Sequence, residues 1–251
     1  MMRLLKAVFS VLILATAAFA GDLTITMNNQ TKSPMGSGSS GVQTHYYSAK
    51  FMRMNDPGAQ RDTLMDYGTM TNYIIDHKKK LIQKMTLQDA MDAMKEASGQ
   101  EREGMSEMMS KMFGDPNNFK VTEEGQETVA GRSCNKYRIM VGKIVMDMSN
   151  DPTLKMPMSE ASYQNMLKMR GASMAASPTG KSFARLYEEM AKIKGFTLKS
   201  HMTGMMGMDI LTVATAVKEG AIDPSVFALP SGYQMEDLGA KIKAQMAKQH
   251  R

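Results

Sequence analysis

The sequence predicts an α+β domain built on an antiparallel sheet, with helices covering one face of that sheet. Two observations support this prediction. Short β-rich segments of alternating character run through the chain, and three longer segments with helical periodicity interrupt or follow them. Strands first and last with helices between them are typical of antiparallel α+β domains, in which a sheet face needs a cover. The helices are the obvious cover.

The strands are predicted from six segments that are rich in β-formers and separated by turns. Asp76-His77-Lys78, for example, divides two apolar runs as a hairpin turn does. The six segments are DLTITMN (22–28), VQTHYYSAKFMRM (42–54), TNYIIDHKKKLIQKM (71–85), KYRIMVGKIVMDM (136–148), GFTLKSHM (195–202) and MDILTVATAV (208–217).

The helices are predicted from apolar residues that recur every three or four positions. An inserted segment at 86–113 carries its methionines at this spacing, with a weak point at Gly99 and Gly104 between its two halves. Two further amphipathic helices are predicted at 182–194 and, at the C-terminus, over 235–249. The 86–113 methionines are Met91, Met94, Met105, Met108, Met109 and Met112, and the C-terminal apolar positions are Met235, Leu238, Ile242 and Met246.

The first twenty residues predict a secretory signal peptide. Arg3 and Lys6 precede an apolar run at 7–18, and Ala18-Phe19-Ala20 supplies a small-residue cleavage pattern. The run is shorter than the ~20 residues that a membrane span needs. We therefore expect a soluble single domain at 21–251, periplasmic or secreted and without stable membrane insertion. No Cys lies near the cleavage point to carry a lipid anchor.

Composition narrows the classes of function. The net charge of +6 falls to +4 without Arg3 and Lys6, and the basic residues are scattered among acidic ones, which argues against nucleic-acid binding. Cys134 is the single cysteine, so no internal disulfide forms; we expect a half-buried strand thiol, with pairing between chains as the alternative. The chain has 30 Met against 15 Leu and no Trp. A flexible thioether has replaced a stiffer aliphatic side chain.

Three segments resemble a known family. They are VTEEGQETVAGRSCNKYRI (121–139), GFTLKS (195–200) and FALPSGYQM (227–235), and the likeness extends over roughly residues 21–237. They resemble the secreted bacterial family named domain of unknown function 4412, which looks like a relative of the lipoprotein carriers LolA and LolB. The resemblance implies an open half-barrel of antiparallel strands whose concave apolar face is covered by helices and receives acyl chains. It implies no catalytic residue, and it makes Arg53 a candidate for latching the helical lid.

Motifs for enzymatic chemistry are weak. Gly36, Gly38 and Gly41 match a dinucleotide spacing but precede a β-rich segment where a helix is needed, and SPTGKS (177–182) lacks the first glycine of a phosphate loop. The four histidines have no paired zinc spacing. We therefore predict a non-enzymatic protein with no catalytic residue, cofactor or metal site.

The methionines leave three interpretations open. They can form core and lid packing alone, or an adaptable surface for varied apolar ligands, or soft ligands for Cu(I). The metal interpretation rests on Met52 and Met54, Met146 and Met148, Met156 and Met158, and HMTGMMGM at 201–208. However, residues two apart on a strand share a face, so burial alone gives the same spacing.

We predict a protein that binds or carries an apolar small molecule or lipid under a methionine-rich helical lid, with another envelope protein as delivery partner. Soft-metal handling is the alternative. The predicted ligand-binding residues are Met91, Met94, Met105, Met108, Met109, Met112, Phe113 and Arg53.

Overall fold

A computed structural model describes residues 21–34, 38–89, 92, 119–159, 162, 193–205 and 207–249. Twelve strands form one sheet in this part of the chain, together with a short 3-10 helix and a C-terminal helix. The elements are β1 (Leu23–Lys32), β2 (Ser39–Tyr47), β3 (Phe51–Asp56), β4 (Arg61–Asp66), β5 (Thr71–Asp76), β6 (Leu81–Thr86), β7 (Phe119–Val129), β8 (Arg132–Val141), β9 (Ile144–Asp151), β10 (Phe196–Met205), β11 (Met208–Glu219), η1 (Pro224–Phe227), β12 (Gln234–Asp237) and α5 (Leu238–Gln249).

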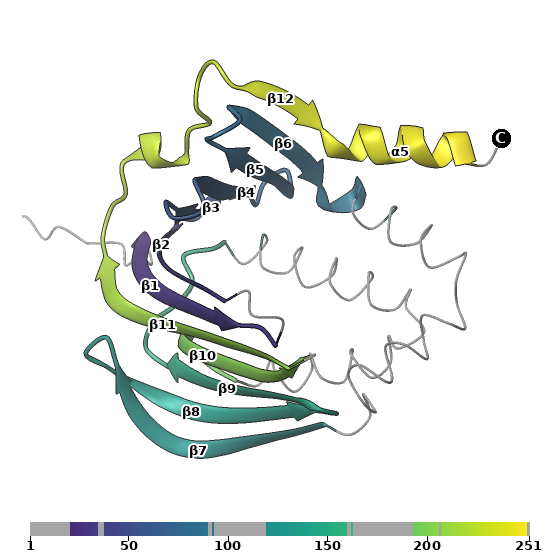
Figure 1. Ribbon diagram of the computed structural model, residues 1–251. Helices are drawn as coiled ribbons and strands as arrows, with labels where there is room; N and C mark the ends of the chain where they lie inside the picture. The colour runs from purple at the N-terminus through teal and green to yellow at the C-terminus, as the bar shows by residue number, and fades with distance from the viewer. Residues whose placement is uncertain are drawn as a thin grey trace, which may run out of the picture.

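The sheet is open and strongly curled (Figure 1). Its strand order is β12-β6-β5-β4-β3-β2-β1-β11-β10-β9-β8-β7, and the pairs are antiparallel except for β12 against β6. The register shifts in the pairings of β1 with β11, of β9 with β10, of β10 with β11 and of β7 with β8. Such bulges bend a strand and increase its twist. They account for the curl of this part of the sheet.

Strands β3 to β6 follow a ten-residue repeat of six strand residues and four turn residues. Asp56, Asp66 and Asp76 each end a strand, and each accepts a hydrogen bond from a turn N–H with its Oδ1. The last turn residue then adopts a positive φ near 50° in all three turns. An acceptor that folds back onto its own turn is the usual reason for Asp at this place.

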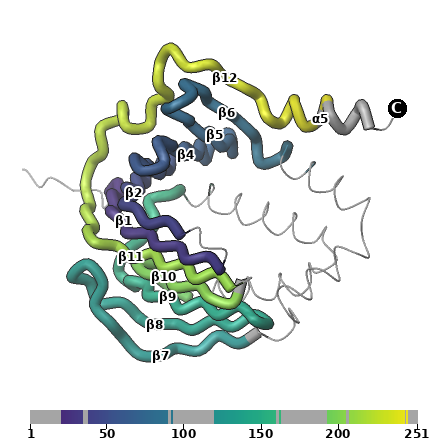
Figure 2. Tube along the Cα trace, viewed as in Figure 1, coloured from purple at the N-terminus to yellow at the C-terminus, as the bar shows by residue number. Residues whose placement is uncertain are grey.

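The segment that follows β11 returns along the outside of the curl and joins β12 to β6 (Figure 2). Its Phe227 stacks on Phe51 with ring centroids 5.6 Å apart and belongs to a buried cluster with Leu64, Ile75 and Ile82. One face of β3 to β6 is therefore covered by residues 221–233, which we call the strap.

The C-terminal helix begins later than the sequence predicts. Met235 lies in β12 opposite Ile82, and α5 starts at Leu238. Asp237 accepts a hydrogen bond from the Ala240 N–H at 2.9 Å, so its side chain caps the helix. The open edge of β6 offers backbone partners that the helical pattern from Met235 could not reveal.

A second buried cluster fills the bend of the sheet. Leu23, Ile25 and Met27 alternate with half-buried neighbours along β1, as a one-sided strand requires. Tyr47 meets Phe196 edge to face in the same cluster. Cys134, expected to be half-buried, is fully buried there.

The predicted antiparallel sheet is confirmed, and the described part of the chain is mostly β. Strand β4 was not predicted, and neither was β7. The predicted helices at 86–113 and 182–194 lie almost wholly outside the described residues, so helices over the concave face stay a prediction, as does the signal peptide. Among the described residues, no helix is long and apolar enough to cross a membrane.

Candidate functional site

The strand register gathers methionines on one face of the sheet. Met52 lies opposite Tyr47 and Met65, and Asn72 connects Met65 to Met85 in the same row. Residues directly opposite each other share a face, and alternate residues return to it. The face is defined by Met27, Met52, Met54, Met65, Met85, Met146, Met148 and Met202, and we call it the methionine face.

The opposite face has a different character in each half of the sheet. Under β3 to β6 it packs against the strap, which runs outside the curl, so the methionine face lines the inside (Figure 1). Across β8 to β10 the opposite face carries ion pairs. Arg138 donates to Asp147 at 2.7 Å, and Lys199 to Glu127 at 2.9 Å.

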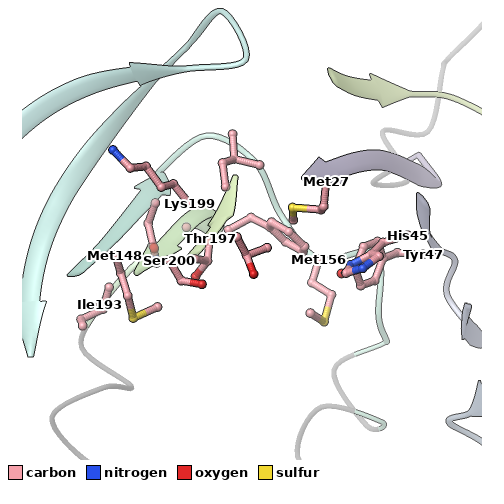
Figure 3. Close-up of a pocket in the computed structure, with 14 residues that line it drawn as sticks. Met27, His45, Tyr47, Met148, Met156, Ile193, Thr197, Lys199 and Ser200 are labelled. Atoms are coloured by element: carbon pink, nitrogen blue, oxygen red, sulfur yellow. The ribbon is translucent and has the colours of Figure 1, made fainter. Parts of the chain in front are cut away.

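A cavity of ≈ 510 Å³ lies on the methionine face where β1, β2, β9, β10 and β11 meet (Figure 3). A volume of this size suits a small ligand. Much of its wall is apolar, and the polar part of the wall includes His45, Asn150 and several hydroxyls. The apolar part includes Met27, Tyr47, Met148, Met156, Phe196 and Leu198.

The polar groups on the β2 side of the cavity satisfy one another. Burial lowers the pKa of His45, so its imidazole is neutral at pH 7. Burial, with Tyr67 nearby, raises the pKa of Tyr47, whose hydroxyl keeps its proton. The consistent assignment has the Tyr47 hydroxyl donating to His45 Nδ1 at 3.2 Å and His45 Nε2 donating to Gln43 Oε1 at 3.3 Å. Gln43 in turn donates to Asp56 at 2.7 Å.

The polar groups on the β9–β10 side are less complete. Lys199 lines the cavity, but its ammonium binds Glu127 and points away from Met148 and Ser200 (Figure 3). Asn150 is only 4% exposed, and its Oδ1 has no hydrogen-bond partner among the described residues. A buried carbonyl oxygen without a donor is uncommon and asks for a cause.

Gly195 brings the two strands close at this side of the cavity. It has a φ of +91°, and a Cβ there would lie 2.1 Å from the backbone oxygen of Asp151. Only glycine fits this approach. The β9–β10 wall therefore depends on that residue.

Arg53 is the one predicted site residue within the described part of the chain. It lies on the strap side, opposite the methionine face, and pairs with the buried carboxylate of Asp62. Its Nη1 also donates to the carbonyl oxygens of Val226 at 2.6 Å and Ala228 at 3.1 Å. Arg53 thus holds the strap to the sheet, and its role at a lid or ligand stays a prediction.

The other predicted ligand-binding residues, Met91 to Phe113, lie outside the described residues. The residues of the proposed copper motif at 201–208 do not all lie on one face of the sheet. His201 faces Asp209 at 2.9 Å, on the side opposite Met202, so these two neighbours do not converge. The described residues contain no group of three or more His, Cys, Asp or Glu side chains that could hold a metal ion.

Sequence reasoning missed the residues that line the cavity. Tyr47, Asn150 and Phe196 come from three different strands, and no local motif connects them. The one available signal was the alternation of Met52 with Met54 and of Met146 with Met148, which places each pair on one face.

The family model DUF4412, a domain of unknown function, matches residues 19–233. No protein of curated function matches the sequence. The chain is similar in structure to an uncharacterized conserved protein from Thermus thermophilus, with a TM-score of 0.45, 8% identity, and coverage of 87% of this chain and 91% of that one. It is also similar to MucB in the Pseudomonas aeruginosa MucA/MucB complex, with a TM-score of 0.43, 12% identity, and coverage of 86% and 58%. For the LolA superfamily protein NE2245 from Nitrosomonas europaea the TM-score is 0.35, with 6% identity and coverage of 84% and 91%.

Proposed function

The chain belongs to the DUF4412 family of domains of unknown function, and we propose that it binds an apolar ligand, such as an acyl chain or lipid, on the methionine face. The observation that supports this proposal is the placement of the methionines on one face of the sheet, where a cavity of ≈ 510 Å³ lies beside Met27 and Met148. Binding is its whole activity in this proposal, with no chemical step and no cofactor.

The side chains of the methionine face suit a ligand of variable shape. Methionine has three rotatable side-chain bonds and a polarisable sulfur, so a surface built from it repacks around different apolar partners. Leucine would give a better-defined core and a less adaptable surface. The ion pairs on the opposite face of β8 to β10 are suited to water, which leaves the methionine face as the side for an apolar guest.

The predicted helical segment at 86–113 completes the proposal. Its methionines and Phe113 would cover the ligand as a lid, since this segment connects β6, next to the end strand β12, to β7 at the other end of the curled sheet. We further propose a location in the cell envelope after removal of residues 1–20, and an envelope protein that delivers or receives the ligand.

Nile red, an uncharged dye that becomes fluorescent in apolar surroundings, tests the proposal. Wild-type protein should bind it saturably. Changing Met52 and Met65 together to Ser should weaken binding by roughly tenfold or more, because burying each Met side chain contributes about 1.5–3 kcal/mol. The same double change to Leu should keep binding within about threefold, because Met-to-Leu swaps usually cost less than about 1.5 kcal/mol.

The matched control is Met140→Ser. Met140 is 40% exposed on β8 and faces away from the methionine face, so its loss should leave dye binding unchanged. Absence of any dye binding by the folded wild-type protein would refute the proposal. Equal losses from the Met140 and the Met52/Met65 serine variants would refute the assignment of the face.

A further inference from the structure

Asn150 is a polar residue of the cavity wall whose side-chain oxygen the described part of the chain leaves without a donor. The residue is only 4% exposed, it lines the cavity, and its Oδ1 accepts no hydrogen bond within the described residues. Buried amide oxygens are nearly always paired. The described residues therefore leave this acceptor without a donor at the wall of the cavity.

The neighbouring polar groups have partners of their own. Asn135 lies directly opposite Asn150 on β8, but its Oδ1 accepts from Gln126 at 3.1 Å. The imidazole and hydroxyl of His45 and Tyr47 bond to each other and to Gln43. The donors of Tyr47 and His45 are therefore already engaged, and a ligand donor would meet Asn150 without competition from them.

The charges around the cavity select against an ionic ligand. Among the described residues that line it, none is Asp or Glu, and the ammonium of Lys199 is paired with Glu127 at 2.9 Å. His45 is neutral at pH 7 because burial lowers its pKa. Moving an ionic head into this wall would cost desolvation without an opposite charge to offset it.

We propose that the cavity takes a neutral amphiphile whose polar end, a hydroxyl or an amide N–H, donates a hydrogen bond to Asn150 Oδ1. This inference rests on the proposed function and specifies the head of the apolar ligand. The chain of that ligand lies against the apolar wall that Met27, Met148 and Phe196 provide.

Four competitors of bound Nile red that share a ten-carbon chain test the inference. Decan-1-ol and decanamide donate a hydrogen bond, methyl decanoate only accepts one, and decanoate carries a negative charge. For the wild-type protein the two donors should compete roughly three- to tenfold better than the ester, after correction for their octanol partition. The relative strength of the alcohol and the amide then distinguishes the two kinds of head. Decanoate should compete no better than the ester.

The variant Asn150→Leu removes the acceptor at similar volume. In this variant the two donors should compete less than about twofold better than the ester, a ratio that we call the donor advantage. Its affinity for Nile red should stay within about threefold of the wild-type value. The ratio between wild type and variant cancels the intrinsic hydrophobicity of each competitor. Asn28→Leu, an exposed asparagine on β1 outside the cavity, is the matched control and should keep the advantage.

Three results would overturn the inference: an ester that competes as well as the alcohol, decanoate as the tightest ligand, or a donor advantage that survives Asn150→Leu. In the first case the Asn150 oxygen is satisfied by water or by its own chain. If Asn150→Leu does not fold, the wild-type series still decides. Nile red binding without a donor preference overturns this inference alone, whereas no Nile red binding overturns the proposed function with it.

Discussion

Replacing Arg53 by Met should strongly destabilise the protein, because Arg53 neutralises a buried charge and ties down the strap. The Asp62 side chain is 1% exposed and that of Arg53 is 13% exposed. Arg53 donates to Asp62 through Nε at 3.0 Å and through Nη2, and Nη1 reaches the carbonyls of Val226 and Ala228. Methionine fills a similar volume and offers none of these donors.

The magnitude follows from what remains after the change. Asp62 keeps Asn55 Nδ2 at 2.9 Å and His77 Nε2 at 3.2 Å, but within the described ranges no permanent cation then faces its carboxylate. Removing one partner of a buried ion pair costs about 3–5 kcal/mol, a large part of the roughly 5–15 kcal/mol that stabilises a domain. Adding Asp62→Asn should restore about half of the loss, because the neutral amide no longer carries a buried charge.

Urea unfolding followed by far-UV circular dichroism at pH 7 measures the loss as a lower midpoint. Arg61→Met is the matched control: Arg61 is 57% exposed and its contact with Asp76 is 4.0 Å long. Such a surface pair contributes at most about 1 kcal/mol. A loss for Arg53→Met no larger than that for Arg61→Met would refute the reasoning, and so would an Asp62→Asn change that deepens the loss.

Three other outcomes are expected. Burial acts to raise the pKa of Asp151, but hydrogen bonds from Arg132 and Thr153 more than offset it and hold the pKa below its usual 3.8. The ionised Asp151 therefore stabilises the folded state above pH ~3.8, and this stabilisation is lost as the pH falls further. Arg132→Met should shift acid unfolding, followed by circular dichroism, to higher pH. Cys134 is fully buried and burial raises its thiol pKa, so a thiol reagent at pH 8 should label it only after denaturation; labelling of the native protein would contradict this. N-terminal sequencing of protein exported by its own host should begin at Gly21, and retention of residues 1–20 would contradict the predicted signal peptide.

The strands that the sequence predicts are those that contain short runs of β-branched, aromatic and other apolar residues. Strand β7 was not predicted because Glu123, Glu124 and Glu127 give it a loop-like composition, although it pairs with β8 over most of its length. Strand β4 was not predicted because its sequence, RDTLMD, has few residues that favour strands. A better signal was present: Asp56, Asp66 and Asp76 recur every ten residues, and this period follows directly from six strand residues and a four-residue turn.

The cavity was harder to predict than the sheet because its wall depends on register. Phe196 meets Tyr47 although 149 positions separate them, and a bulge between Thr197 and Lys199 changes which β10 residues turn inward. The Asn150 acceptor is equally hidden in sequence. An asparagine near a strand end is common, and only its burial without a donor makes it informative.

The methionine spacing carried more information than local composition suggests. Met52 and Met54 alone predict one strand face, and Met146 and Met148 alone predict another. The strand order shows that these two faces are one, because paired residues point to the same side from each strand to the next across β2, β1, β11 and β10. Selection for burial in a core would be met equally well by the strap side, yet that side of β3 to β6 buries Leu64, Ile75 and Ile82 instead. Met52, Met54, Met65 and Met85 all lie on the other face of these strands, and this one-sided placement of the thioethers favours an adaptable binding surface over a core of methionine.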